Sequence, residues 1–88
     1  MLKIEKEVVI KSEQGLHARP AALFVQLANK FDCEIVVRKG KDVVNGKSIM
    51  GILMLAAEKG STLMVCAEGQ DAEKAVEELT QFLVNSSS

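Results

Sequence analysis

The only histidine of the chain, His17, lies in the stretch 15–20, which reads Gly-Leu-His-Ala-Arg-Pro. Imidazole is the side chain whose ordinary pKa, ~6.5, lies closest to neutral pH, and its neutral nitrogen is a nucleophile. Arg19 can hold phosphate oxygens through paired hydrogen bonds. Pro20 suits the first turn of a helix, where the backbone N–H groups of Ala18 and Arg19 would be free to bind an anion. The spacing therefore indicates that His17 carries a phosphoryl group.

Other interpretations of these residues remain open. A histidine before a helix is often only a capping or packing residue. A small hydrolase with a phosphohistidine intermediate would need an acid near His17, and Glu13 is the only close candidate in the sequence. A passive binding module would not be phosphorylated at all. A zinc site is not expected, because Cys33 and Cys66 form no C-x-x-C pair and there is one histidine. We interpret the two cysteines as reduced thiols.

Length and composition indicate one small globular domain over residues 1–88. Hydrophobic residues make up 48% of the chain and aromatic residues 3%, so the core is expected to be mainly aliphatic. The net charge of −1 gives no field that would attract nucleic acid. The N-terminus is charged, and no apolar run is long enough to insert into a membrane. We therefore expect a cytoplasmic protein.

Hydrophobic periodicity and turn residues predict seven elements of secondary structure. The strands are expected at 4–10, 34–38, 42–44 and 63–67, and the helices at 18–31, from 49 to 55 or beyond, and from 72 onward. In the first strand, Lys6 breaks the alternation. Ser48 and Asp71 are expected to cap the second and third helices, and Gly60 is expected to end the second. Residues 85–88 are expected to form a frayed tail.

The order β-α-β-β-α-β-α predicts a two-layer α+β domain. Because apolar and polar residues alternate along the strands, one face of the sheet is expected to be wet, which favours antiparallel pairing. The helices would then cover the other face. The alternation places Cys66 on the open face of the sheet, where we expect an unreactive thiol without a basic neighbour.

Three segments together resemble the HPr family, the histidine-containing phosphocarriers of the bacterial phosphoenolpyruvate-dependent sugar phosphotransferase system. The first is the stretch 15–20 around His17. The second is 47–51, Lys-Ser-Ile-Met-Gly, which resembles the regulatory serine segment of that family. The third is 67–71, Ala-Glu-Gly-Gln-Asp, before the last helix. The resemblance covers essentially the whole chain.

The resemblance implies an open-faced β-sandwich, in which three helices cover one face of a four-stranded antiparallel sheet. It implies that His17 accepts phosphate on Nδ1 from enzyme I and passes it to the IIA domains of sugar permeases. Arg19 and the N–H of Ala18 would steady the phosphate, with no cofactor or metal. We expect a monomeric carrier with no turnover of its own. The alternative is a mainly regulatory paralogue, of a nitrogen-type or permease-lacking system, that signals through His17 and Ser48.

Two further expectations concern Ser48 and the helix that follows it. In many family members the matching serine is also phosphorylated by HPr kinase/phosphorylase, a modification that acts on partners such as a transcriptional regulator. The helix after Ser48 is more apolar than a surface helix requires, so part of it should stay exposed and bind partners. The expected docking residues are Leu23, Lys47, Ile49, Met50 and Leu53, with Arg19 and Lys47 supplying charge.

Overall fold

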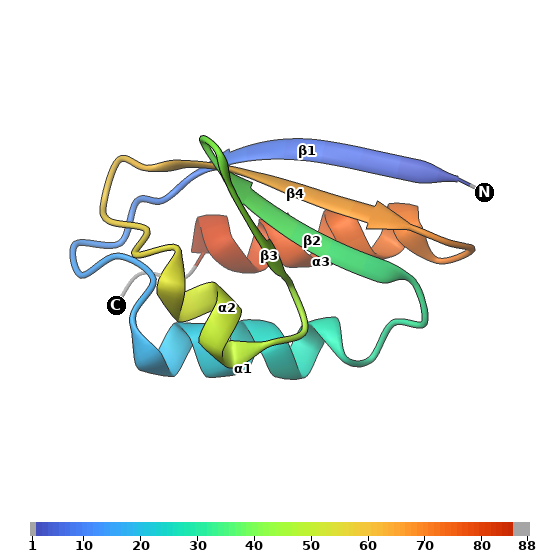
Figure 1. Cartoon of the computed structure of the whole chain (residues 1–88), viewed down its shortest axis with the longest axis horizontal. Helices are drawn as coiled ribbons and strands as arrows, with labels where there is room; N and C mark the ends of the chain where they lie inside the picture. The colour runs from blue at the N-terminus through green and yellow to red at the C-terminus, as the bar shows by residue number, and fades with distance from the viewer. Residues whose placement is uncertain (1, 86–88) are drawn as a thin grey trace.

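The sheet has four antiparallel strands in the order β1-β4-β2-β3 (Figure 1). The computed structural model of the chain describes residues 2–85. The strands are β1 (Lys3–Val9), β2 (Glu34–Lys39), β3 (Asp42–Asn45) and β4 (Thr62–Glu68). The register places Val8 opposite Leu63 and Val37 opposite Val65. These side chains are buried, so one face of the sheet is apolar, as the alternation predicts.

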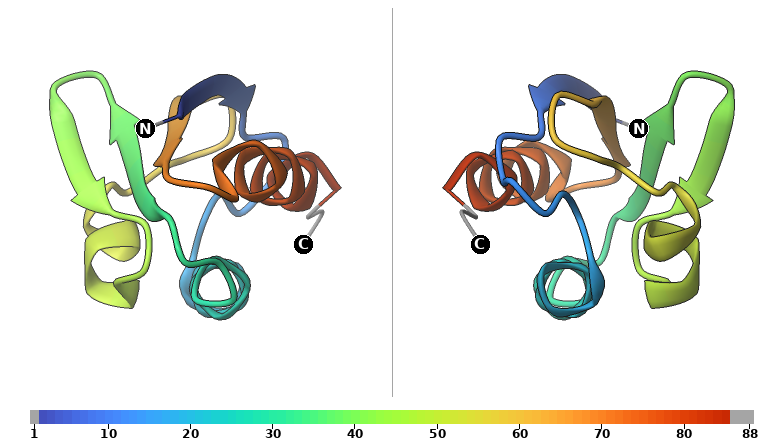
Figure 2. Two further views of the ribbon diagram at one scale, coloured as in Figure 1. Left: turned by 90° about the vertical axis from the view of Figure 1, so that its right-hand side faces the viewer. Right: turned by 90° about the vertical axis from the view of Figure 1, so that its left-hand side faces the viewer.

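Three helices lie on that apolar face and leave the other face open (Figure 2). They are α1 (Ala18–Ala28), α2 (Ile49–Met54) and α3 (Ala72–Asn85). The rings of Phe24 on α1 and Phe82 on α3 pack at a centroid distance of 6.4 Å and an interplanar angle of 58°. The expected βαββαβα open-faced sandwich is confirmed. None of the helices in the described residues is long and apolar enough to cross a membrane.

The core between the layers is mainly aliphatic. Phe24 from α1, Ile52 from α2, Leu63 and Val65 of β4, and Leu79 of α3 belong to one hydrophobic cluster, and all five are fully buried. Burying one such side chain stabilises the fold by about 1.5–3 kcal/mol. The helices that carry the candidate site are therefore fixed by their apolar faces, while their outer faces remain available.

The expected C-terminal ends of α1 and α2 are wrong, and α3 extends one residue into the expected tail. α1 ends at Ala28, because the N–H groups of Lys30 and Phe31 bond three residues back, to Leu27 and Ala28, and close turns. α2 ends at Met54 and not near Gly60. Ala56 adopts φ +50°, which turns the chain out of the helix. Asn85 belongs to α3, whereas 86–88 lie outside the described residues.

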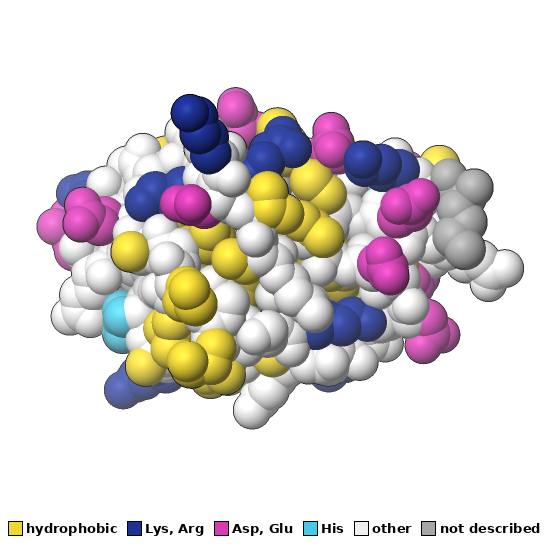
Figure 3. Space-filling model, viewed as in Figure 1, with side chains coloured by type: hydrophobic (Ala, Val, Ile, Leu, Met, Phe, Trp, Pro, Cys, Tyr) yellow, Lys and Arg dark blue, Asp and Glu magenta, His cyan; other side chains and the backbone are white. Residues whose placement is uncertain are grey.

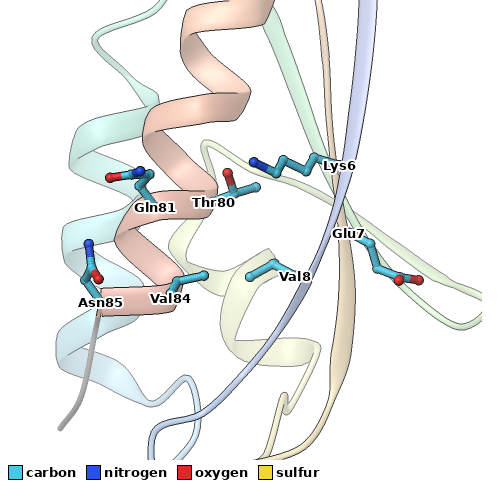
Figure 4. A pocket seen from close by; sticks show the side chains of 7 residues that line it. All are labelled: Lys6, Glu7, Val8, Thr80, Gln81, Val84 and Asn85. Carbon is cyan, nitrogen blue, oxygen red and sulfur yellow. The ribbon is translucent and has the colours of Figure 1, made fainter.

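The lysine that breaks the alternation of β1 lies on an edge strand. Among the described strands β1 pairs only with β4, so Lys6 reaches solvent beside α3 and extends toward Thr80 (Figure 4). A cavity of about 160 Å³ lies here, lined by Lys6, Glu7, Val8, Thr80, Gln81, Val84 and Asn85. The Thr80 hydroxyl donates to the carbonyl of Val76 at 2.7 Å, so its hydrogen has an acceptor within α3. Lys6 stands at a position of β1 where the alternation expects an inward-facing apolar residue. A charge there, on an edge strand, also opposes pairing with a strand of another chain.

Candidate functional site

His17 occupies the N-cap position of α1, but its ring does not cap the helix. Its backbone is extended, with φ −93° and ψ −166°, and its carbonyl accepts a hydrogen bond from the N–H of Ala21 at 2.9 Å. The side chain makes no capping hydrogen bond and is half-buried. The backbone of His17 thus begins the helix while the imidazole is left free for other chemistry.

The first turn of α1 presents donors without acceptors. Within residues 2–85, the N–H groups of Ala18 and Arg19 have no protein hydrogen-bond partner. The first turn contains no acidic residue, and the Arg19 side chain is exposed beside it. Pro20 is buried and has no N–H that needs an acceptor. The two free N–H groups, the positive end of the helix and the guanidinium therefore form an anion-binding arrangement next to the imidazole.

The loop before His17 is fixed by a close approach of two backbones. The N–H of Leu16 donates to the carbonyl oxygen of Ala57 at 2.8 Å, and the Leu16 side chain is buried. Gly15 has φ +71°, and a Cβ added to it would lie 2.5 Å from the Ala57 oxygen and 2.9 Å from Glu58 Cα. Only glycine fits both the conformation and the contact. The loop after α2 therefore sets the path of the chain into His17.

Further contacts join the same two loops. The N–H of Ile10 donates to the carbonyl of Ser61 at 2.8 Å, and the N–H of Gly60 donates back to Ile10 at 2.7 Å. At the surface, Lys59 forms an ion pair with Glu13. Glu13 is the acid that a hydrolase mechanism would need, and the structure pairs its carboxylate with a lysine. This pairing weakens the hydrolase interpretation.

Ser48 is the N-cap of α2, as the sequence predicts. Its backbone is extended, and its Oγ accepts a hydrogen bond from the N–H of Gly51 at 3.1 Å. The turn before it is closed by Asn45, whose carbonyl accepts from the N–H of Ser48 at 3.1 Å. The Ser48 side chain is half-buried. A hydroxyl at a helix N-terminus is also a position where added phosphate is electrostatically stabilised.

The side chain of Lys47, an expected docking charge, is bonded within the protein, and its docking role stays a prediction. Its Nζ donates to the carbonyl oxygen of Phe31 at 2.6 Å, and the residue is half-buried. This contact joins the turn before α2 to the turn that ends α1. The lysine therefore links the two helices, and Arg19 is the expected docking cation that is exposed.

An apolar surface lies beside the histidine (Figure 3). We call it the α2 surface, and its side chains are 36–75% exposed: Leu23, Ile49, Met50, Leu53 and Met54. By contrast, Ile52 and Leu55 face inward and are buried. The four expected apolar docking residues are thus exposed together on α1 and α2. Their gathering in one area is typical of a protein-binding surface.

The cysteines are structural. Cys33 is buried, and its N–H and that of Asp32 donate to the Asp71 carboxylate at 3.0 and 2.9 Å. Burial, and then the hydrogen bond and charge of Asp71, raise the pKa of the Cys33 thiol to about 11. The same hydrogen bonds lower the pKa of Asp71, and the bond from the N–H of Asp32 has the largest effect. Asp71 lies directly before α3, as expected, and its carbonyl accepts the N–H of Ala75 at 3.0 Å. Its carboxylate, expected to cap α3, instead ties α3 to the turn before β2.

Cys66 lies on the open face, as expected, but it is covered by its neighbours. It is 8% exposed, and its Sγ approaches Glu5 Oε2 at 3.5 Å. Burial and this contact raise the pKa of the thiol, while Arg38 and Lys3 nearby lower it. The expectation that no basic neighbour is present was wrong, yet the net effect still disfavours the thiolate. In the part of the chain described, no group of three His, Cys, Asp or Glu residues could hold a metal ion.

Comparisons with known proteins agree with this geometry. Residues 4–85 match the family described as PTS HPr component phosphorylation site. The HPr-like protein Crh of Halalkalibacterium halodurans is 50% identical over 80 residues, 91% of this chain and 95% of that protein. The crystal structure of the phosphocarrier protein HPr from Bacillus anthracis superposes with a TM-score of 0.90, at 46% identity, over 94% of this chain and 99% of the other. The crystal structure of Bacillus subtilis Crh, a domain-swapped dimer, gives a TM-score of 0.77 at 38% identity, over 97% of this chain and 98% of the other.

Proposed function

The chain belongs to the HPr family of phosphocarrier proteins, and from that premise we propose that His17 accepts a phosphoryl group from phospho-enzyme I and donates it to IIA domains of sugar permeases. One observation carries this proposal. The imidazole at the start of α1 has no capping hydrogen bond, and the N–H groups of Ala18 and Arg19 beside it have no hydrogen-bond partner among residues 2–85. These are the features that a reversible phosphoryl acceptor needs.

The transfer follows from these groups. A ring nitrogen of His17, Nδ1 by family resemblance, attacks phosphorus while the bond between phosphorus and the donor atom breaks. The charge on the phosphoryl oxygens is met by the free N–H groups of Ala18 and Arg19 and by the Arg19 guanidinium. Such reactions depend mainly on positioning and charge stabilisation. A nucleophile of the accepting partner then attacks the phosphorus, and the bond between phosphorus and the His17 nitrogen breaks. His17 is left unchanged, so the protein is a carrier with no turnover alone.

The partners would dock on the α2 surface. Its five exposed apolar side chains adjoin His17, and Arg19 adds a positive charge. Enzyme I and IIA domains would use the same area in turn, because both must reach the same imidazole. We place the protein in the cytoplasm, where such partners operate. We also propose that it acts as a monomer, since one chain completes the core; sedimentation at micromolar concentration would reveal a dimer such as that of Crh.

The second proposed site is Ser48, as the substrate of an HPr kinase/phosphorylase. Its hydroxyl caps α2 at the edge of the α2 surface, so a dianion there would enter the docking area and alter the choice of partner. The identity of 50% to an HPr-like protein Crh supports a second candidate function, a mainly regulatory carrier that acts on a transcriptional regulator. That function would use Ser48 and the α2 surface, with or without transfer through His17.

An intact-mass experiment tests phosphorylation at His17 and at Ser48 separately. The protein is incubated with phosphoenolpyruvate, magnesium and a bacterial enzyme I, alongside His17→Ala and Ser48→Ala. We expect one acid-labile phosphoryl adduct on the wild type and on Ser48→Ala, and none on His17→Ala. A folded protein that gains no adduct, while a known HPr does, would contradict the carrier proposal. ATP with an HPr kinase/phosphorylase should give an acid-stable adduct that Ser48→Ala lacks.

A further inference from the structure

Lys39, at the end of β2, bonds to the chain that leaves α2. Its Nζ donates to the carbonyl oxygens of Leu55 and Ala56, both at 3.2 Å. The last carbonyls of a helix have no partner within it, and a lysine is one way to satisfy them. The bond to Leu55 is partly buried, so water competes less for that carbonyl than at an open surface, whereas the bond to Ala56 lies at an exposed position. Lys39 thus fixes the point where the chain turns out of α2.

That turn is held in an uncommon conformation. Ala56 has φ +50°, and it is the one residue other than glycine with a positive φ among residues 2–85. This conformation costs an L-residue free energy that the surroundings must offset. The two hydrogen bonds from Lys39 flank the strained residue, one to its own carbonyl and one to that of Leu55. They are the side-chain contacts that hold it there.

The position of this turn affects the loop that leads into His17, which contains Gly15 and Leu16 and is called the histidine loop below. Ala57, next after the strained residue, is buried, and its carbonyl accepts the N–H of Leu16 at 2.8 Å. Gly15 lies so close to the same oxygen that no Cβ would fit. His17 follows directly. A shift of the Ala57 carbonyl would therefore move the residues that lead into His17.

We propose that Lys39 is a positioning residue for phosphoryl transfer, acting on His17 through Ala56, Ala57 and Leu16. The proposal rests on the phosphocarrier function of His17. It assigns Lys39 no contact with the phosphoryl group and no place on the α2 surface. The lysine keeps the loop after α2 in the conformation that presents the imidazole beside the free N–H groups of α1.

The test compares Lys39→Met, which keeps the aliphatic stem and removes the donors, with Lys39→Arg, which keeps charge and donors. Lys41→Met removes a lysine from the same hairpin at an exposed position and controls for net charge. Native-state hydrogen exchange then reports on two amides. In Lys39→Met we expect Leu16 to exchange about tenfold faster, because its acceptor is loosened, while Ile10, bonded to Ser61, is unchanged. Lys39→Arg and Lys41→Met should resemble the wild type.

Phosphorylation kinetics with enzyme I supply the second measurement. For Lys39→Met we expect kcat to fall about fivefold with little change in KM, since misplacing a nucleophile slows chemistry more than docking. An equal rise in the exchange of Leu16 and Ile10 would mean a general loss of stability and would overturn the proposal. A higher KM with normal kcat would overturn it too, by making Lys39 a docking residue. If enzyme I does not phosphorylate the wild type, the proposed function is refuted instead. The exchange data would still show whether Lys39 stabilises the hydrogen bond between Leu16 and Ala57.

Lys39→Met can be repeated in an Ala56→Gly background if it folds poorly. Glycine removes the conformational cost of the positive φ at this position. The Leu16 amide should still be less protected than in Ala56→Gly alone, because Lys39 also bonds to Leu55. Equal protection in the two proteins would contradict the proposal.

Discussion

Replacing Gly15 with alanine should damage the fold at the point where two loops touch. Gly15 has φ +71°, a conformation that costs alanine about 1 kcal/mol. Its new Cβ would also lie 2.5 Å from the carbonyl oxygen of Ala57 and 2.9 Å from Glu58 Cα. Both are backbone atoms, and the Ala57 oxygen already accepts the N–H of Leu16. Such overpacking costs about 1–3 kcal/mol. We expect Gly15→Ala to lower the free energy of unfolding by about 3 kcal/mol.

The matched control is Gly40→Ala in the β2–β3 turn. Gly40 has a similar φ of +58°, but a Cβ there would have no atom within 4 Å. The control therefore carries the conformational cost alone, about 1 kcal/mol. The difference between the two variants, about 2 kcal/mol, isolates the close approach of Gly15 to Ala57.

Urea unfolding at neutral pH, followed by circular dichroism, measures both variants. For a domain of this size the dependence of stability on urea is about 1–1.5 kcal/mol per molar, so the midpoint of Gly15→Ala should lie about 1.3–2 M below that of Gly40→Ala. Equal midpoints would refute the inference that the loop after α2 restricts the histidine loop. The amide of Leu16 should also lose protection from exchange in Gly15→Ala and keep it in Gly40→Ala.

Three further predictions concern caps and titrating groups. Ser48→Ala should lower stability by about 1 kcal/mol and Ser48→Gly by only a few tenths, as for other N-caps. Thermal unfolding of the two variants tests this, and a Ser48→Ala variant as stable as the wild type would mean that the hydroxyl does not stabilise α2. The pKa of Asp71 is lowered in the fold, so its carboxylate stabilises the protein above the ordinary carboxyl range and less as the pH falls through the folded pKa. The stability difference between wild type and Asp71→Asn, measured in urea at pH 7 and near pH 3, should therefore shrink in acid, whereas a constant difference would contradict the assignment. Because the pKa of Cys33 rises from 9.0 to about 11, iodoacetamide at pH 8 should alkylate it at least about tenfold more slowly in the folded protein than in urea, as peptide mass mapping would show.

The parts of the site that the sequence predicts correctly are those with local causes. His17 precedes a helix because Pro20 and the apolar face that includes Phe24 define where that helix begins and what it buries. Ser48 caps α2 through a bond to Gly51, three residues away. The element order and the apolar face of each strand follow from periodicity in the same way. Such signals lie within a few residues of the structure they predict.

The features that sequence analysis missed arise from contacts between distant segments. Lys47 looks like a free docking charge, but its acceptor is the carbonyl of Phe31, 16 residues earlier. Lys39 carries no motif, and only the folded chain brings it to the end of α2. The end of α2 was misjudged because Gly60 is the expected stop signal, whereas Ala56, a residue that rarely adopts positive φ, makes the turn.

The shape of the site also explains how one imidazole could serve several partners. The cavity between β1 and α3 and the one on the open face of the sheet around Cys66 are lined by neither His17 nor Arg19. The histidine instead lies beside the α2 surface, whose side chains are apolar and exposed (Figure 3). A pocket would select one small substrate by enclosing it, but an exposed nucleophile beside an apolar area selects whatever protein surface fits against that area. If His17 carries the phosphoryl group as proposed, specificity would reside in docking, while the N–H groups of α1 and Arg19 would act on the phosphoryl group in the same way for every partner. A substitution on the α2 surface, such as Met50→Ala, should therefore affect donor and acceptors unequally, whereas His17→Ala should abolish transfer with all of them.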